Sequence, residues 1–200
     1  MLLKEVFLLR LSNCRKCALC KKQESGFRRT QVVLGRGSDE YGFIFVGEAP
    51  GEFEDKNGDP FCPEAPAGEM YDKILKNLSL VRKMVYTTNV VKCRPTQVGT
   101  VGAKNREPSD IERDACRPWM VKEITKIKPK LIVTMGATAL RSVVGVGGVL
   151  RHAGRLIRVK EFDCFVFPIF HPASIIYDND RKIKTKAHIL ALRAALREIF

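Results

Sequence analysis

Short apolar runs separated by amphipathic stretches dominate the pattern of hydrophobic and polar residues along the chain. Nearly continuous apolar runs of this length are typical of strands that are buried on both faces of a parallel sheet. The pattern predicts strands at Gly42–Gly47, Met84–Asn89, Leu131–Met135 and Phe165–Phe170, and a further strand at Leu156–Lys160 that forms a hairpin with the last of them.

Amphipathic stretches between the strands have the spacing of helices. They predict helices at Gly68–Leu80, Ser109–Ile127, Ala137–Val144 and Thr185–Phe200. The second helix opens with Ser109 and has Glu112 three residues later, which is a capping-box pattern. Strands that alternate with helices predict an α/β fold, here a three-layer α/β/α sandwich around a mainly parallel four-stranded sheet. Arg94–Glu107 is expected to be a long polar loop.

The length of 200 residues favours one domain, which we expect to span residues 1–200. No apolar run approaches the length that crosses a bilayer. The first residues, MLLKEVFLLRLSNC, carry charges within their apolar stretch and therefore indicate an amphipathic helix rather than a signal peptide. We expect a cytoplasmic, monomeric protein with no membrane association.

Net charge is the unusual feature of the composition. Thirty-five Lys and Arg against 22 Asp and Glu give +13, which favours a polyanionic partner. The alternative is the solvated surface of a thermophilic or small cytosolic protein. Basic residues cluster in Arg15–Arg36 and Arg181–Lys186, and this clustering favours the binding interpretation.

Seven cysteines indicate a metal site. Their odd number and the absence of a secretory signal argue against a disulfide framework. Cys14 and Cys17 form a Cys-x-x-Cys pair that Cys20 extends, while Cys93 and Cys116 are distant in sequence. Two local and two remote thiolates can close a tetrahedral site for zinc or an iron–sulfur cluster, and the spacing alone does not distinguish these metals.

Two strand-end loops carry the candidate chemistry. The first reads GEAPGEFEDKNGDPF after the apolar run that ends at Val46, and the second is the HPAS turn that begins at His171. Loops at the carboxyl ends of parallel strands meet at one edge of the sheet, where α/β proteins place their sites. Together these motifs resemble the uracil-DNA glycosylase superfamily, most closely its iron–sulfur members (family 4), and the resemblance covers roughly residues 10–198.

An enzyme that hydrolyses a glycosidic bond to a pyrimidine must extrude the nucleotide, read the base, stabilise the departing base anion and place a water. The amide of Asn89 matches the N3–H and O4 of uracil, and TNVVKCRP aligns with the uracil-reading Asn of the family. The ring of Phe61 can stack on the base. A neutral imidazole of His171 can donate a hydrogen bond to O2.

The loop that follows the first strand supplies the remaining candidates. In the best-known relatives an Asp orients the water at the position of Ala49, so Glu48 or the backbone of residues 47–51 would do so here. Glu54 and Asp55 are nearby carboxylates that can assist. Gly47 allows close approach of the backbone to a ligand. An apolar wedge formed by Ile175, Ile176 and Tyr177 is expected to fill the gap that the extruded base leaves.

The resemblance also implies a [4Fe-4S] cluster that ties down the N-terminal segment. The implied ligands are Cys14, Cys17, Cys93 and Cys116. Cys20 is an alternative ligand for one position. Cys62 and Cys164 are interpreted as buried apolar residues, and His152 and His188 as structural.

Two segments depart from the family pattern. Residues 62–68 are longer and richer in proline than usual, and residues 97–103 are an extension. Residues 103–108 lack the His with which one branch traps DNA covalently, so we expect turnover. The resemblance implies a monofunctional glycosylase that excises uracil from DNA and begins base excision repair. The alternatives are a glycosylase for another deaminated base, such as hypoxanthine, and a non-catalytic DNA-binding module; no protein partner is identifiable.

Overall fold

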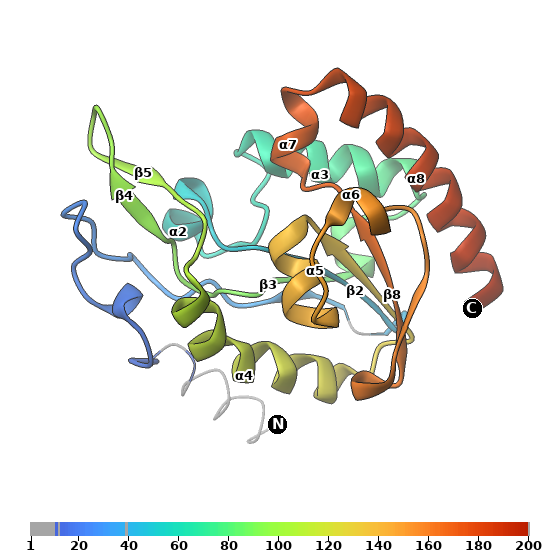
Figure 1. The fold of residues 1–200 in the computed structure, drawn as a ribbon, viewed down its shortest axis with the longest axis horizontal. Helices are drawn as coiled ribbons and strands as arrows, with labels where there is room; N and C mark the ends of the chain where they lie inside the picture. Colours follow the sequence, from blue (N-terminus) through green and yellow to red (C-terminus); the bar gives the residue numbers. More distant parts are fainter. Residues whose placement is uncertain (1–10, 12, 39, 200) are drawn as a thin grey trace.

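The computed structural model describes residues 11, 13–38 and 40–199, and a mixed sheet runs through their centre (Figure 1). In spatial order the strands are β1 (Arg36–Gly37), β3 (Tyr86–Asn89), β2 (Phe43–Gly47), β6 (Leu131–Met135), β8 (Cys164–Ile169) and β7 (Ile157–Val159). The four inner strands are parallel, and the two edge strands β1 and β7 are antiparallel to their neighbours. The carboxyl ends of the inner strands therefore meet at one edge of the sheet.

Helices cover both faces of this sheet. One face carries α4 (Asp110–Ile127) and α5 (Ala137–Val144), and the other carries α3 (Pro66–Asn77) and α8 (Asn179–Ile199). The shorter elements are α2 (Glu52–Asn57), α6 (Val149–His152), α7 (Pro172–Ile176) and the 3-10 turns Ala18–Cys20, Arg82–Met84 and Lys160–Phe162.

Alternate residues of the central strand β2 face the two hydrophobic clusters of the core. Ile44 and Val46 pack in the cluster under α4 and α5, whereas Phe43 and Phe45 pack in the cluster under α3 and α8. All five residues of β2 are buried. This double burial explains the unbroken apolar run in the sequence, since no residue of the strand faces water.

The predicted three-layer architecture is confirmed, but the sheet has six strands rather than four. The additional strand β1 is two residues long and exposed, so it leaves no periodic signal in the sequence. The predicted hairpin is present and turns through Lys160–Phe162. The last helix begins at Asn179 instead of Thr185. Asp178 Oδ1 accepts a hydrogen bond from the amide of Arg181 at 3.0 Å and so starts the helix upstream of its apolar stripe.

The predicted start of α4 is confirmed in detail. Ser109 Oγ accepts from the amide of Glu112 at 3.3 Å, and the Glu112 carboxylate accepts from the amide of Ser109 at 2.8 Å. These reciprocal bonds satisfy two donors at the start of the helix.

The prediction of a loop over Arg94–Glu107 is wrong, because this segment contains a β-hairpin. Strand β4 (Thr96–Val98) pairs with β5 (Ala103–Asn105), and the amide of Gly99 donates to the carbonyl of Gly102 at 2.9 Å. Gly102 has a φ of +65°, a conformation that a residue with a Cβ rarely adopts. Hydrogen bonds stabilise this hairpin, and its residues show no apolar periodicity from which a strand could be predicted.

Most of the predicted N-terminal amphipathic helix, residues 1–10 and 12, lies outside the residues that the structure describes. Within the described ranges, no helix combines the length and apolarity that a bilayer span requires.

Candidate active site

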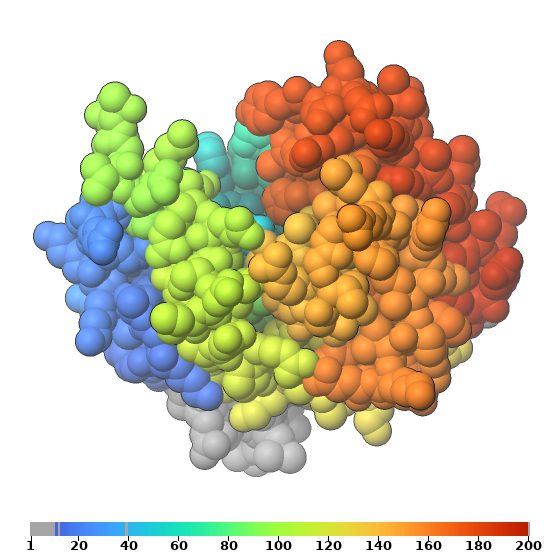
Figure 2. All heavy atoms as spheres, in the orientation of Figure 1, coloured from blue at the N-terminus to red at the C-terminus, as the bar shows by residue number. Residues whose placement is uncertain are grey.

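A cleft of about 420 Å³ opens at the carboxyl edge of the parallel strands. In Figure 2 the surface is hollowed between the green β4–β5 hairpin and the red segment that contains α7. Four chain segments contribute to its lining: the loop after β2 with α2, the turn at Phe61 that leads into α3, the base of the hairpin, and α7 with its flanking residues. The lining includes the predicted site residues Glu48, Ala49, Phe61, His171, Ile176 and Tyr177.

Gly47 and Asn89 end two adjacent parallel strands and are paired in register. A Cβ at Gly47 would overlap the Oδ1 atom of Asn89 and would stand 2.6 Å from the ring of Phe61. The absence of a side chain at this position therefore lets the amide and the ring come together. Asn89 is 3% exposed, and its Oδ1 has no hydrogen-bond partner among the described residues. A buried acceptor without a partner is costly, and a ligand with a matching donor removes this cost.

The Phe61 ring is close both to an aromatic residue of the core and to a residue at the carboxyl edge of the sheet. Its centroid is 5.1 Å from that of Tyr71 and 5.6 Å from the imidazole of His171. Phe61 has a φ of +52°, which is strained for an aromatic residue. The start of α3 contacts this turn closely, since a Cβ at Gly68 would lie 2.7 Å from the carbonyl oxygen of Phe61. The surrounding backbone thus fixes the ring.

His171 is the N-cap residue of α7, and its Nδ1 atom accepts a hydrogen bond from the amide of Ala173 at 3.2 Å. This bond assigns the proton of the neutral imidazole to Nε2. Burial lowers the pKa of His171 to about 4, so the ring is uncharged at neutral pH. His171 therefore offers one fixed N–H donor.

Glu48 shares a hydroxyl group with a second carboxylate. Its Oε2 lies 2.5 Å from Thr138 Oγ1, and the same hydroxyl is 3.0 Å from Oε1 of Glu107. Burial raises the pKa of Glu48, the bond from Thr138 opposes this shift, and the negative charge of Glu107 adds to it. The hydroxyl has one proton, so it can donate to only one carboxylate at a time.

Sequence reasoning missed both Thr138 and Glu107. Thr138 is the second residue of α5, directly after the end of β6, and this position at a strand-to-helix junction was the available signal. Glu107 precedes the proline at the start of α4, and only the tertiary structure brings it to the same hydroxyl.

Two further carboxylates near the first loop have structural partners. Glu54 lines the cleft, but its Oε2 accepts from the amide of Gly51 at 3.0 Å and caps α2. Asp55 is 1% exposed and accepts from the amide of Thr30 at 2.9 Å. Glu48 is therefore the candidate for activating a water.

Two of the three residues that were expected to form a wedge line the cleft. Tyr177 is 85% exposed and lines the cleft together with Ile176. The inclusion of Ile175 in an exposed wedge is wrong, because it is 2% exposed and packs in the core cluster under α3 and α8.

The N-terminal cysteines lie against Cys93 and Cys116. Cys14, Cys17, Cys20, Cys93 and Cys116 line one small space. Three N–H groups donate to these sulfur atoms: Arg29 Nη1 to Cys93 at 2.8 Å, Trp119 Nε1 to Cys14 at 3.3 Å and the Lys92 amide to Cys116 at 3.4 Å. Such donors suit thiolates, because they stabilise negative charge on sulfur. Cys62 and Cys164 are buried elsewhere.

Comparison with known proteins gives the same family as the motifs. The sequence profile of the Uracil DNA glycosylase superfamily matches residues 34–197. A type-4 uracil-DNA glycosylase of Sulfurisphaera tokodaii is 38% identical over 180 residues, which are 86% of this chain and 75% of that protein. A type-4 enzyme of Thermotoga maritima is 34% identical over 186 residues, or 91% and 88% of the two chains. A type-5 uracil-DNA glycosylase of Pyrobaculum aerophilum is 25% identical over 216 residues.

The profile match extends over most of the chain and includes the strand ends that carry Gly47, Asn89 and His171. The two type-4 relatives named above are more than 30% identical and are matched over 75% and 88% of their own length. The chain belongs to the uracil-DNA glycosylase superfamily.

Proposed function

We propose that this protein is a monofunctional uracil-DNA glycosylase of the iron–sulfur type, which extrudes uracil from DNA and hydrolyses its N-glycosidic bond. The observation that carries the proposal is the buried Oδ1 of Asn89, which has no partner among the described residues and lies beside the ring of Phe61, itself 5.6 Å from the imidazole of His171. Such a site fits a planar ring with a donor on its edge. The family and the names of the relatives support uracil as that ring.

Base recognition follows from the amide of Asn89. Its Oδ1 accepts from N3–H of uracil, and its Nδ2 donates to O4. Cytosine presents the opposite pattern at these two positions, so it leaves the buried amide unsatisfied. The fixed ring of Phe61 stacks on one face of the base.

Bond cleavage places negative charge on the base. A water oxygen forms a bond to C1′ of the sugar while the bond from C1′ to N1 breaks, and the electron pair of that bond goes to the uracil ring. His171 donates from Nε2 to O2, where part of this charge develops. Glu48 orients the water and accepts its proton. Ile176 and Tyr177 occupy the space that the base vacates in the duplex.

Thr138→Val is expected to slow uracil release about tenfold at neutral pH, because the hydroxyl that orients Glu48 is lost. The hydrogen bond from Thr138 opposes the rise of the Glu48 pKa. Its removal raises that pKa further, so the loss of activity on acidification should begin at a higher pH. Single-turnover rates measured across the pH range test both effects.

Thr138→Ser is the matched control, since it keeps the hydroxyl and should retain the wild-type profile. An unchanged rate and acid limb in the valine variant would show that Thr138 does not act through Glu48.

Cys14, Cys17, Cys93 and Cys116 would hold the [4Fe-4S] cluster. The donor set fits, since these thiols surround one space with N–H donors to three of the sulfur atoms. Across the described residues, no three cysteine, histidine or acidic side chains form a site for a single metal ion. When bound, the cluster would supply a cross-link between the N-terminal segment, the segment after β3 and α4.

Cys93→Ser should remove the visible absorption of the cluster and lower the melting temperature by about 10 °C, because metal binding contributes to folding free energy. Cys164→Ala, at a buried cysteine outside this group, is the control and should keep its iron. Absorption spectra, iron content and thermal unfolding of the two variants show whether Cys93 is a ligand of the cluster. Full iron content in the Cys93 variant would exclude this residue as a ligand.

A base-release assay tests the proposed function. Duplexes with one uracil, thymine or hypoxanthine are incubated with the protein, and abasic sites are then cleaved with alkali. Breakage with uracil alone supports the proposal. Breakage with hypoxanthine instead would point to the unusual segment of residues 62–68, which leads into α3 and whose Ala65, Pro66 and Ala67 line the cleft. Binding without breakage would favour a non-catalytic module.

A further inference from the structure

The β4–β5 hairpin forms a wall of the cleft. Thr96 lies opposite Asn105 and Val98 opposite Ala103, and Asn105 and Arg106 at its base line the cleft. Figure 1 shows the hairpin projecting from the body of the protein. In Figure 2 these two elements stand on either side of the hollow. We refer to residues 96–105 as the hairpin arm.

A buried arginine holds the base of the arm against α2. Arg94 is 4% exposed, and its Nε donates to Oδ1 of Asn105 at 2.7 Å. Its Nη2 donates to the carboxylate of Glu52 at 3.1 Å, and its guanidinium lies 4.8 Å from the ring centroid of Phe27. These contacts fix the direction in which the arm leaves the protein, because a planar guanidinium donates with defined geometry.

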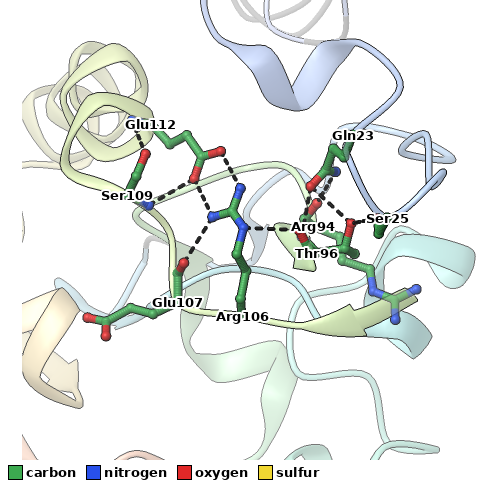
Figure 3. Close-up of polar contacts among 8 residues, drawn as sticks. All are labelled: Gln23, Ser25, Arg94, Thr96, Arg106, Glu107, Ser109 and Glu112. Carbon is green, nitrogen blue, oxygen red and sulfur yellow. Dashed lines mark hydrogen bonds and ion pairs between the residues drawn. The ribbon is translucent and has the colours of Figure 1, made fainter. Parts of the chain in front are cut away.

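A second arginine links the arm to α4, as Figure 3 shows. Arg106 donates from Nε to the carbonyl of Thr96 at 3.0 Å and forms a two-pronged ion pair with Glu112 at 2.6 and 2.7 Å. The side chain of Gln23 also accepts from the amide of Thr96 at 2.8 Å and donates to the carbonyl of Arg94 at 2.9 Å. Arg94, Arg106 and Gln23 therefore anchor the base of the hairpin arm to three neighbouring segments.

The tip of this anchored arm is apolar and exposed. Val98 is 71% exposed and Val101 is 95% exposed. Residues 94–106 include Lys104 and two arginines but no carboxylate. These exposed valines do not pack in the core, although the base of the arm is held by several hydrogen bonds. Exposed apolar side chains on an anchored element beside a cleft point to contact with a ligand.

We propose that the hairpin arm is a second DNA-binding element, which contacts a groove of the duplex beside the extruded nucleotide. This inference rests on the proposed function of the cleft. Val98 and Val101 make apolar contacts within the groove, and Lys104 contacts a phosphate. The arm contacts the duplex on one side of the flipped base, and Ile176 and Tyr177 contact it on the other side of the cleft.

Three observations favour DNA over a protein partner. The arm is continuous with the cleft through Asn105 and Arg106, so DNA that delivers a base to the cleft passes beside it. Its lack of carboxylates suits a polyanion. A two-stranded ribbon also has dimensions that a DNA groove admits.

The test compares affinities for duplex DNA that carries 2′-fluoro-deoxyuridine, whose fluorine resists glycosidic cleavage. Val101→Glu should weaken binding of this duplex about tenfold, because a carboxylate is brought toward phosphates, and Val101→Ser should weaken it about threefold. Leu190→Glu, at a 65% exposed position on α8, is the control and should bind as the wild type does. Affinity for a trinucleotide centred on the same nucleotide should be unchanged in all variants, since it does not reach the tip.

Equal duplex affinity for Val101→Glu, Leu190→Glu and the wild type would overturn the proposal. So would equal losses on the duplex and the trinucleotide, which would indicate damage to the cleft. The measurement involves no base release. It therefore decides the role of the arm even if the base-release assay fails to detect uracil excision.

Discussion

Replacing His171 with alanine should slow uracil release by about three orders of magnitude, with little change in DNA affinity. The imidazole is neutral and its Nδ1 accepts from the amide of Ala173, so Nε2–H is the donor that we propose for the base. That donor matters most when the glycosidic bond breaks and charge develops on O2. The substitution therefore affects the transition state more than the ground state. Single-turnover rates and equilibrium binding to the same duplex separate these two effects.

His171→Asn provides a control, because its side-chain amide can restore an N–H donor and should recover part of the rate. The protonation state of the ring is directly measurable by NMR. The resonances of His171 should titrate near pH 4, since burial lowers its pKa to about this value. A titration near the ordinary value of about 6.5 would contradict the neutral donor. A wild-type rate in the alanine variant would remove His171 from the mechanism.

Replacing Asn89 with alanine should lower kcat/KM for uracil release by about three orders of magnitude, because sites that read a base by hydrogen bonds lose both affinity and orientation. The stability of the free protein should change little by comparison. Oδ1 of Asn89 is buried without a partner among the described residues, so the variant sacrifices no hydrogen bond at this atom. Measurements of kcat/KM and of the melting temperature on the same preparation show whether activity is lost without a loss of stability.

Asn77→Ala removes the same side chain from the exposed surface of α3 and is the control for the substitution itself. A fall in melting temperature in proportion to the loss of activity would mean that Asn89 holds the strand ends together rather than reading the base. Retained activity would transfer base recognition to other groups of the cleft.

The sequence predicted the parallel strands and the edge of the sheet at which the site forms. Strands such as β2 are buried on both faces, so their apolar runs are unbroken and their ends are marked by a change to polar or small residues. Once the strand ends are placed, the register of a parallel sheet brings Gly47 and Asn89 together. The apolar pattern therefore predicted that Gly47 and Asn89 are neighbours, because it predicted the strands at whose ends they lie.

Other features depend on tertiary contacts that no pattern reports. The hairpin arm is held by Arg94 and Arg106. The partner of Arg94, Glu52, is 42 positions away, and the sequence marks Glu112 only as part of a capping box, not as the partner of Arg106. The contact between Glu48 and Thr138 joins residues 90 positions apart. Ile175 is buried and the nearby Tyr177 is exposed because of the way in which the five-residue helix α7 packs. A helix this short has too few residues for the sequence to show which of its faces is apolar.

The order of the strands in the sheet has a consequence for synthesis of the protein. Strand β6 pairs with β2 on one side and with β8 on the other, and β8 ends two residues before His171. A nascent chain that has not reached β8 already contains the cysteines of the proposed cluster and Asn89, but β6 presents an unpaired apolar edge. Such a chain exposes a strand edge that favours association with other chains, and it lacks His171, the proposed donor to the base. Synthesis therefore supplies the last inner strand of the sheet and His171 of the proposed site almost together.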